Sequence, residues 1–259
     1  MTTAERDIRW SESTGLCYSR RGAGNIVLLV HGWCLSKELW QYLERDLVEQ
    51  GHDVIAVDLA GFGASGELSG PYGFDRHAAD LEALAEELSL TSVTAVGFAF
   101  GAGVLMSLLD DSRFAGLVCI GAPSAAGAPY DKMRRAMLRD WPRFADNSAT
   151  AIVAREHSPQ TLRWLGDMFG ATRLPVAIAG AETLAGFEPL EVEQHWRVPS
   201  LFLHGADDTI VSAEISTGCA TRFGGAEAVF IPDSGHLVPI DQPERLRDEI
   251  VAFVARVAE

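Results

Sequence analysis

The sequence predicts an α/β fold in which a mostly parallel β-sheet has helices on both faces. Short runs of apolar and β-branched residues recur along the chain without alternating polar positions. Such runs are expected of strands that are covered on both faces. Longer segments with apolar residues at helical spacing lie between the runs. This alternation of strand and helix is typical of a parallel sheet.

Six apolar runs are the expected strands. The first is Ile26–Val30 (IVLLV), and the others are 53–58, 92–97, 117–121, 200–203 and 228–231. Apolar residues share a helical face in segments 39–47, 81–88 and 246–257. We therefore expect one α/β core.

The alternation stops between residues 122 and 197, where only helix-like segments such as 130–144 and 161–169 occur. An insertion at this point predicts a helical cap above the site. The predicted domains are a core of 1–121 and 198–259 and an inserted cap of 122–197. The alternative is that these helices simply extend one face of the sheet.

Composition excludes several classes of function. The chain has 259 residues, of which 21 are Lys or Arg and 36 are Asp or Glu, so its net charge is −15. This charge disfavours binding to nucleic acid or to an anionic membrane. The four cysteines are scattered, without metal-ligand spacing, which predicts free thiols in a reducing compartment. The charged start of the chain and the lack of a long apolar run predict a cytoplasmic protein, and we expect no metal and no cofactor.

Ligands of parallel sheets bind beyond the carboxyl ends of the strands, so the residues that follow each strand are the candidates for chemistry. His31-Gly32-Trp33 follows the first strand, and a glycine-rich loop, 59–65, follows the second. This loop lacks the Lys-Ser/Thr ending of a phosphate-binding loop, and the chain has no dinucleotide fingerprint at either plausible place.

The segment GFAFGAG, residues 97–103, follows the third strand. Its small residues permit a sharp strand-to-helix turn of the G-x-S-x-G type, in which the central residue is strained and presented to the ligand. That central residue is Ala99, which has no hydroxyl group. The backbone N–H groups of Phe100 and Trp33 are the predicted oxyanion donors.

Two later strand ends carry the remaining candidates. HGADD, residues 204–208, follows the fifth strand, and PDSGH, residues 232–236, follows the sixth. A carboxylate in the first loop suits an orienting acid, and His236 suits a general base. No carboxylate occupies the competing position in residues 122–124.

The motifs HGW, DLAGFGAS, GFAFGAG, HGADDTIV and SGHLVPIDQPE occur in the order and at the intervals of the α/β-hydrolase superfamily, which the chain resembles over nearly its whole length. The resemblance implies a serine-type triad whose nucleophile position is residue 99. It also implies that the acid is Asp208 rather than Asp207, and that the base is His236.

Ala99 leaves two interpretations open. One is a deliberate Ser→Ala replacement in an otherwise complete enzyme, and the other is a natural pseudo-enzyme that binds without turnover. Because the acid, the histidine and the glycines are all kept, we favour the first. Residues 97–103 contain no other nucleophile, and Cys34 and Ser65 lie in adjacent loops. Under either interpretation, the chain with Ala99 should be nearly inert as a catalyst.

The expected substrate is a carboxylic ester or a lactone. HGWCLSKELW, DLAGFGAS and the late Asp208/His236 pair resemble the pimeloyl-acyl-carrier-protein methyl ester esterase of biotin synthesis. This resemblance implies that basic cap residues meet an acidic carrier protein. Segment 131–163 has seven basic and four acidic residues, and the candidates are Arg134, Arg135, Arg139 and Arg143. For the basic residues, the alternative is a solvated helix face. For the enzyme, a quorum-signal lactonase and an unspecified carboxylesterase remain alternatives, whereas an aspartate-nucleophile dehalogenase fits the GFxFG context less well.

A few apolar cap residues should line the acyl pocket, although most cap aromatics and methionines are core residues by default. The predicted substrate-binding residues are Trp33, Cys34, Met137, Trp141, Trp164 and Met168. Met133 and Phe169 belong to the same set of cap side chains.

Overall fold

The computed structural model describes residues 7–66, 71–108, 112–124, 129–189, 198–223 and 226–258. Within them, one eight-stranded sheet has the order β1-β2-β4-β3-β5-β6-β7-β8. The neighbours β4, β3, β5, β6, β7 and β8 pair in parallel, whereas β1–β2 and β2–β4 pair antiparallel. The strands are β1 (Asp7–Trp10), β2 (Cys17–Gly22), β3 (Ile26–Val30), β4 (Asp53–Val57), β5 (Val93–Phe98), β6 (Phe114–Ile120), β7 (Ser200–Gly205) and β8 (Glu227–Ile231).

The six predicted strands are confirmed as β3 to β8, with ends that differ by up to three residues. The sequence did not predict β1 and β2. All four residues of β1 are exposed, and β2 continues from a buried start into Arg20 and Arg21. β1 is the edge strand, and β2, although paired with β1 and β4, is only partly covered in its second half. Strands of these two kinds lack the continuous apolar run that marks a strand covered on both faces.

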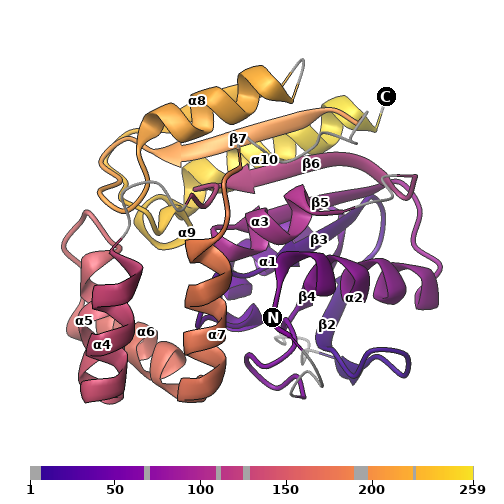
Figure 1. Ribbon diagram of the computed structural model, residues 1–259. Helices are drawn as coiled ribbons and strands as arrows, with labels where there is room; N and C mark the ends of the chain where they lie inside the picture. Colours follow the sequence, from indigo (N-terminus) through magenta and orange to yellow (C-terminus); the bar gives the residue numbers. More distant parts are fainter. Residues whose placement is uncertain are drawn as a thin grey trace.

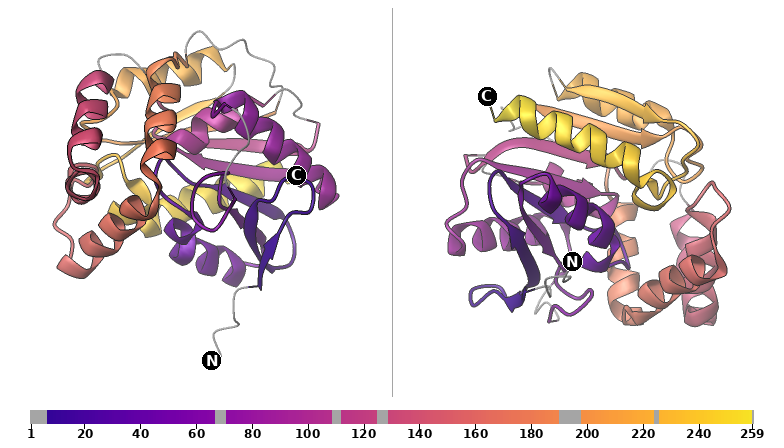
Figure 2. Two further views of the ribbon diagram at one scale, coloured as in Figure 1. Left: turned by 60° about the horizontal axis from the view of Figure 1, so that its bottom comes forward. Right: turned by 180° about the vertical axis from the view of Figure 1, so that it is seen from behind.

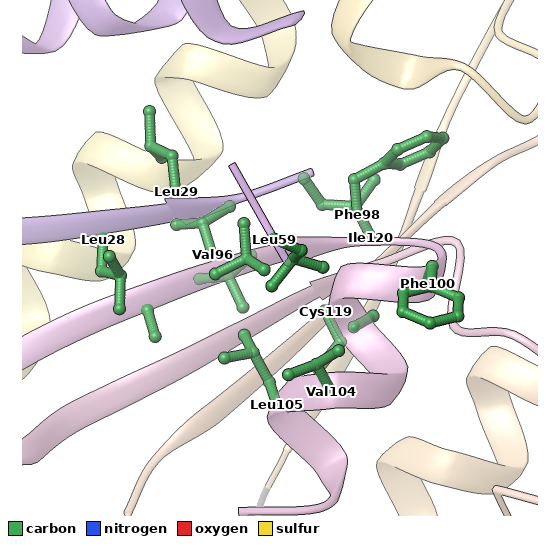
Figure 3. Packing of buried hydrophobic residues seen from close by; sticks show 14 of the residues in the cluster. Leu28, Leu29, Leu59, Val96, Phe98, Phe100, Val104, Leu105, Cys119 and Ile120 are labelled. Carbon is green, nitrogen blue, oxygen red and sulfur yellow. The ribbon is translucent and has the colours of Figure 1, made fainter. Parts of the chain in front are cut away.

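Helices cover both faces of the sheet (Figures 1 and 2). Helices α2, α3 and α8 lie on the near face in Figure 1, and α1 and α10 lie on the opposite face in the right-hand view of Figure 2. Figure 3 shows Val104 and Leu105 of α3 among the buried side chains of the strands. The core helices are η1 (Lys37–Trp40), α1 (Gln41–Glu49), α2 (Phe74–Glu87), α3 (Phe100–Met106), α8 (Ala213–Arg222), α9 (Val238–Asp241) and α10 (Pro243–Val257).

Between β6 and β7, residues 129–189 form four helices and no strand. We call residues 130–185 the four-helix segment: α4 (Tyr130–Arg139), α5 (Trp141–Ala151), α6 (Pro159–Ala171) and α7 (Leu174–Ala185). Each of the last three begins with a proline in its first turn, and Asp140 and Ser158 cap α5 and α6. The segment lies beyond the end of the sheet toward which β6 and β7 point (Figure 1). None of the described helices combines the length and apolarity that crossing a bilayer requires.

Candidate active site

Ala99 occupies the turn between β5 and α3 in a strained conformation. Its φ is 47° and its ψ is −108°, a combination that side chains with a Cβ rarely adopt. Figure 3 shows Phe98 at the end of the strand and Phe100 at the start of the helix. The geometry is that of a nucleophile elbow with a methyl group at its apex.

The turn requires glycine at two positions, because the backbone atoms packed against them leave no room for a side chain. A Cβ on Gly97 would lie 2.6 Å from the carbonyl oxygen of Gly101. A Cβ on Gly101 would lie 2.4 Å from the carbonyl oxygen of Val30, at the end of β3. The start of α3 is therefore packed directly against the backbone that leads into the Trp33 loop.

The two predicted oxyanion donors have N–H groups available for a ligand. Phe100 is the first residue of α3, where N–H groups have no partner within the helix. None of the turn and loop hydrogen bonds among the described residues uses the N–H of Phe100 or of Trp33.

His31 orients the peptide that carries the Trp33 N–H. Its Nε2 accepts a hydrogen bond from the N–H of Leu59 at 3.0 Å, so the proton of the neutral ring is on Nδ1. Nδ1–H then donates to the carbonyl of Gly32 at 2.7 Å. Burial lowers the pKa of His31, which favours this neutral form. Because the C=O and N–H of a trans peptide point in opposite directions, the bond to Gly32 also fixes the Trp33 N–H.

Asp208 and His236 form a buried pair. Nδ1 of His236 lies 2.8 Å from Oδ2 of Asp208, and the carboxylate side chain is fully buried. Its Oδ1 accepts hydrogen bonds from the N–H groups of Ile210 at 2.7 Å and Val211 at 3.0 Å. Burial opposes ionisation, but the charge and hydrogen bond of His236, together with these two N–H groups, hold the pKa of Asp208 below its ordinary value. Asp207, the alternative acid, is exposed.

The imidazole of His236 is directed toward the elbow. Its ring centre lies 5.1 Å from that of Phe98, the residue before Ala99. A Cβ on Gly121 would lie 3.1 Å from its Cε1, so the end of β6 must stay free of side-chain bulk. With Nδ1 bound to Asp208, Nε2 is the nitrogen that remains for a substrate.

His236 and Ala99 line one cavity of about 460 Å³ between the core and the four-helix segment. Its walls are mainly apolar side chains. The core contributes Trp33, Leu35, Phe98, Ala99, Val211 and His236. The four-helix segment contributes Tyr130, Met133, Phe144, Ile152, Phe169 and Leu184. The described residues contain no group of three His, Cys, Asp or Glu side chains that could hold a metal ion.

A sequence model of the family described as alpha/beta hydrolase fold matches residues 25–182, more than half of the chain. The chain belongs to this family. A second model, described as serine hydrolase (FSH1), matches residues 149–247.

Relatives of this α/β-hydrolase carry several activities in their names. The chain is 26% identical to a non-heme haloperoxidase from Rhodococcus erythropolis, over a match that covers 94% of this chain and 97% of the relative. It is also 26% identical to a pimeloyl-[acyl-carrier protein] methyl ester esterase from Cronobacter sakazakii, covering 92% and 96%. The structure of an esterase from Exiguobacterium antarcticum superposes with a TM-score of 0.91 at 22% identity, covering 97% and 100%. The hydrolase fold is therefore shown, and the relatives do not single out one substrate.

Of the six predicted substrate-binding residues of this α/β-hydrolase, only Trp33 lines the cavity. Met137 and Cys34 are fully buried beneath the walls, and burial raises the pKa of the Cys34 thiol well above its ordinary value. Trp141 instead stacks on Phe144 and donates its Nε1–H to the carbonyl of Thr172.

The other two predicted residues, Trp164 and Met168, belong to α6 but do not line the cavity. Helix α6 directs Phe169 toward the cavity and Trp164 toward a separate cavity beside Tyr42. Apolar spacing gives a broad apolar face for α6, which includes Trp164, Met168 and Phe169. It does not say which edge of that face meets the cavity.

Several lining residues were missed by sequence reasoning, although signals for them exist. Phe144, Ser148, Ala151 and Ile152 line the cavity and share one face of α5 at helical spacing. Ile210 and Val211 line it as well and belong to the HGADDTIV motif. In contrast, Ser65 bonds its hydroxyl to the carbonyl of Asp58 at 2.6 Å and does not line the cavity.

Proposed function

We propose that this α/β-hydrolase has the machinery of a serine carboxylic ester hydrolase and lacks only the nucleophile, at Ala99. Asp208 orients His236, His236 is the base, and the N–H groups of Trp33 and Phe100 stabilise an oxyanion. The observation that carries this proposal is the strained Ala99, which lines the same cavity as the histidine of a buried Asp–His pair.

With serine at position 99, its Oγ would attack the substrate carbonyl while Nε2 of His236 takes the proton. The negative charge on the carbonyl oxygen would be met by the two N–H groups. His236 would return the proton to the leaving alcohol, and water would then release the acid by the same steps. With alanine no acyl-enzyme forms, and loss of a triad nucleophile costs on the order of 10⁶ in kcat.

The cavity supports an ester or lactone with an apolar acyl part. Its volume is about 460 Å³ and its walls are mainly apolar. The hydroxyl of Tyr130, in one of these walls, donates to the carbonyl of Ser124 at 3.4 Å. We further propose that the four-helix segment, within residues 122–197, is the cap of this site, since it supplies one wall of the cavity.

The specific candidate is a pimeloyl-acyl-carrier-protein methyl ester. Helix α4 supports it, because Tyr130 and Met133 line the cavity while Arg134, Arg135 and Arg139 are exposed on the same helix. Arg143, in the first turn of α5, is also exposed. An acidic carrier bound to these residues would present its acyl chain at the cavity. A free lactone is the alternative, and it needs no basic surface.

The test is to compare the Ala99 chain with the Ala99→Ser variant on short p-nitrophenyl esters and on lactones. We expect hydrolysis by Ala99→Ser that disappears in Ala99→Ser/His236→Ala. Ala99→Gly controls for any change of backbone strain without a hydroxyl, and should stay inactive. A folded Ala99→Ser variant that hydrolyses no ester, thioester or lactone would contradict the proposal.

A second candidate, favoured by Ala99 itself, is a natural ligand-binding pseudo-hydrolase. It predicts that the genomic codon for residue 99 encodes alanine and that the native chain binds one small molecule tightly. Calorimetric titration of the native chain with intact esters and lactones tests binding without turnover.

A further inference from the structure

One buried carboxylate close to the site has no role in the proposed triad. Asp241 ends α9, five residues after His236, and its side chain is fully buried. Its Oδ2 accepts hydrogen bonds from the N–H of Gly235 at 2.7 Å and of Ala154 at 3.0 Å. Its Oδ1 lies 2.7 Å from Nε2 of His157. The carboxylate thus bonds to residues on both sides of the boundary between the core and the four-helix segment.

Other contacts reinforce this junction between loop 233–241 and segment 151–158, which connects α5 to α6. The N–H of Leu237 donates to the carbonyl of Ile152 at 2.8 Å. Arg155 donates to the backbone carbonyl of Asp241 at 3.3 Å. A Cβ on Gly235 would lie 2.8 Å from the backbone nitrogen of Ala154, so the two backbones approach closely.

The three groups that face the carboxylate are all donors. Backbone N–H groups can only donate, and an ionised carboxylate can only accept, so Nε2 of His157 must carry a proton in this contact. Hydrogen bonds to a charged acceptor are stronger than neutral ones. An asparagine has one acceptor oxygen and one donor NH₂ group. Its oxygen can still accept from the two N–H groups, but without the negative charge, and its NH₂ group then faces His157, whose Nε2 can accept only in the other tautomer.

Both backbone partners of the Asp241 carboxylate, Gly235 and Ala154, adjoin the cavity. Gly235 directly precedes His236, and Ala151 and Ile152 lie in the cavity wall just before Ala154. We propose that Asp241 is a positioning residue: one buried carboxylate fixes the loop of the catalytic histidine and the neighbouring cavity wall relative to each other. This inference rests on the proposed role of His236 as the base.

Hydrogen exchange of the Ala99 chain tests the junction without any activity. We expect Asp241→Asn to speed exchange of both the Gly235 and the Ala154 amides by roughly ten- to a hundredfold, as loss of a charge-assisted bond implies. His157→Ala should speed exchange of the Ala154 amide more than that of the Gly235 amide. The lost contact belongs to the four-helix segment, which contains Ala154, and the carboxylate of Asp241 stays in place for Gly235. Asp233→Asn, the same chemical change at an exposed position of the same loop, should change neither amide.

Steady-state kinetics in the Ala99→Ser background then separates positioning from a purely structural role. Asp241→Asn should lower kcat and raise KM, whereas His157→Ala should mainly raise KM. If Asp241→Asn does not fold, His157→Ala still decides through its selective effect on Ala154. Folded Asp241→Asn protein with unchanged exchange of both amides would overturn the inference. So would unchanged kcat and KM in an active Ala99→Ser background. An inactive Ala99→Ser protein with the expected exchange pattern would refute the proposed hydrolase and leave the junction in place.

Discussion

At the scale of single residues, the conformation of position 99 is set by its surroundings. Ala99 keeps φ 47° although it has no hydroxyl group to present, and such strain costs about 1–3 kcal/mol. The glycines on both sides and the packing of α3 on the end of β3 impose the turn. A serine placed there should therefore adopt the attacking position without rearrangement of the backbone.

His77 is a second residue in an unfavourable environment, because its ionisable ring is buried without hydrogen-bond partners. It is fully buried beside the ring of Phe100, 5.4 Å between ring centres, and neither of its ring nitrogens has a hydrogen-bond partner. Burial, with smaller contributions from His31 and Arg76, lowers the pKa of His77 to about 4. The folded protein therefore holds His77 neutral at pH values where the unfolded chain is protonated.

This difference predicts a loss of stability in mild acid. The folded pKa is lower than the unfolded value of about 6.5, so the contribution is present above pH 6.5 and is lost as the pH falls toward 4. Between pH 7 and pH 5 the Ala99 chain should lose about 2 kcal/mol of unfolding free energy through His77. Urea unfolding at the two pH values should show that the unfolding free energy of His77→Phe falls by about 2 kcal/mol less than that of the parent chain. An equal loss in both proteins would contradict the assignment.

At the scale of elements, the sequence was sufficient where a strand is covered on both faces. Runs such as Ile26–Val30 are continuous and apolar because β3 is buried between helical layers. The edge strand β1, with four exposed residues, gave no such signal. The candidate site residues could also be predicted from the sequence, because they follow recognisable strands and parallel strands bring their carboxyl ends together. The residues of the cavity wall could not be predicted, because they depend on how α4, α5 and α6 are rotated about their axes.

The elbow gives an element-scale prediction. Gly101→Ala should destabilise the protein by about 3 kcal/mol, because its Cβ would meet two backbone carbonyl oxygens that cannot move without shifting β3. Gly170→Ala in α6 is the matched control, since its Cβ would have only ordinary contact with Ala145 at 3.8 Å. It should be neutral or stabilise by about 0.5–1 kcal/mol. Equal denaturation midpoints for the two variants would argue against the tight elbow.

At the scale of the whole molecule, charge is distributed unevenly. The chain carries −15 overall, yet α4 exposes Lys132, Arg134 and Arg135. The acids beside them are Asp131 and Glu182 of α7, which lies 3.5 Å from Arg134. A basic surface on an acidic body can steer an acidic partner to one face. The proposed carrier-protein substrate would use this surface, and a small neutral ester would not.

Charge reversal separates these two substrates. In the Ala99→Ser background, Arg134→Glu/Arg135→Glu should raise KM for a carrier-linked methyl ester about tenfold and leave KM for free dimethyl pimelate unchanged. Arg245→Glu, at an exposed arginine of α10 far along the chain, is the control and should affect neither substrate. Unchanged KM for the carrier-linked ester in the double variant would exclude docking through α4.

The most direct test of the central claim is mass spectrometry after exposure to a fluorophosphonate, which reacts with an activated serine whatever the natural substrate. In Ala99→Ser we predict one phosphonyl adduct on residue 99 that is lost in Ala99→Ser/His236→Ala, and we predict no adduct in the Ala99 chain. A folded Ala99→Ser protein that stays unmodified would contradict the claim that position 99, His236 and Asp208 form one catalytic unit.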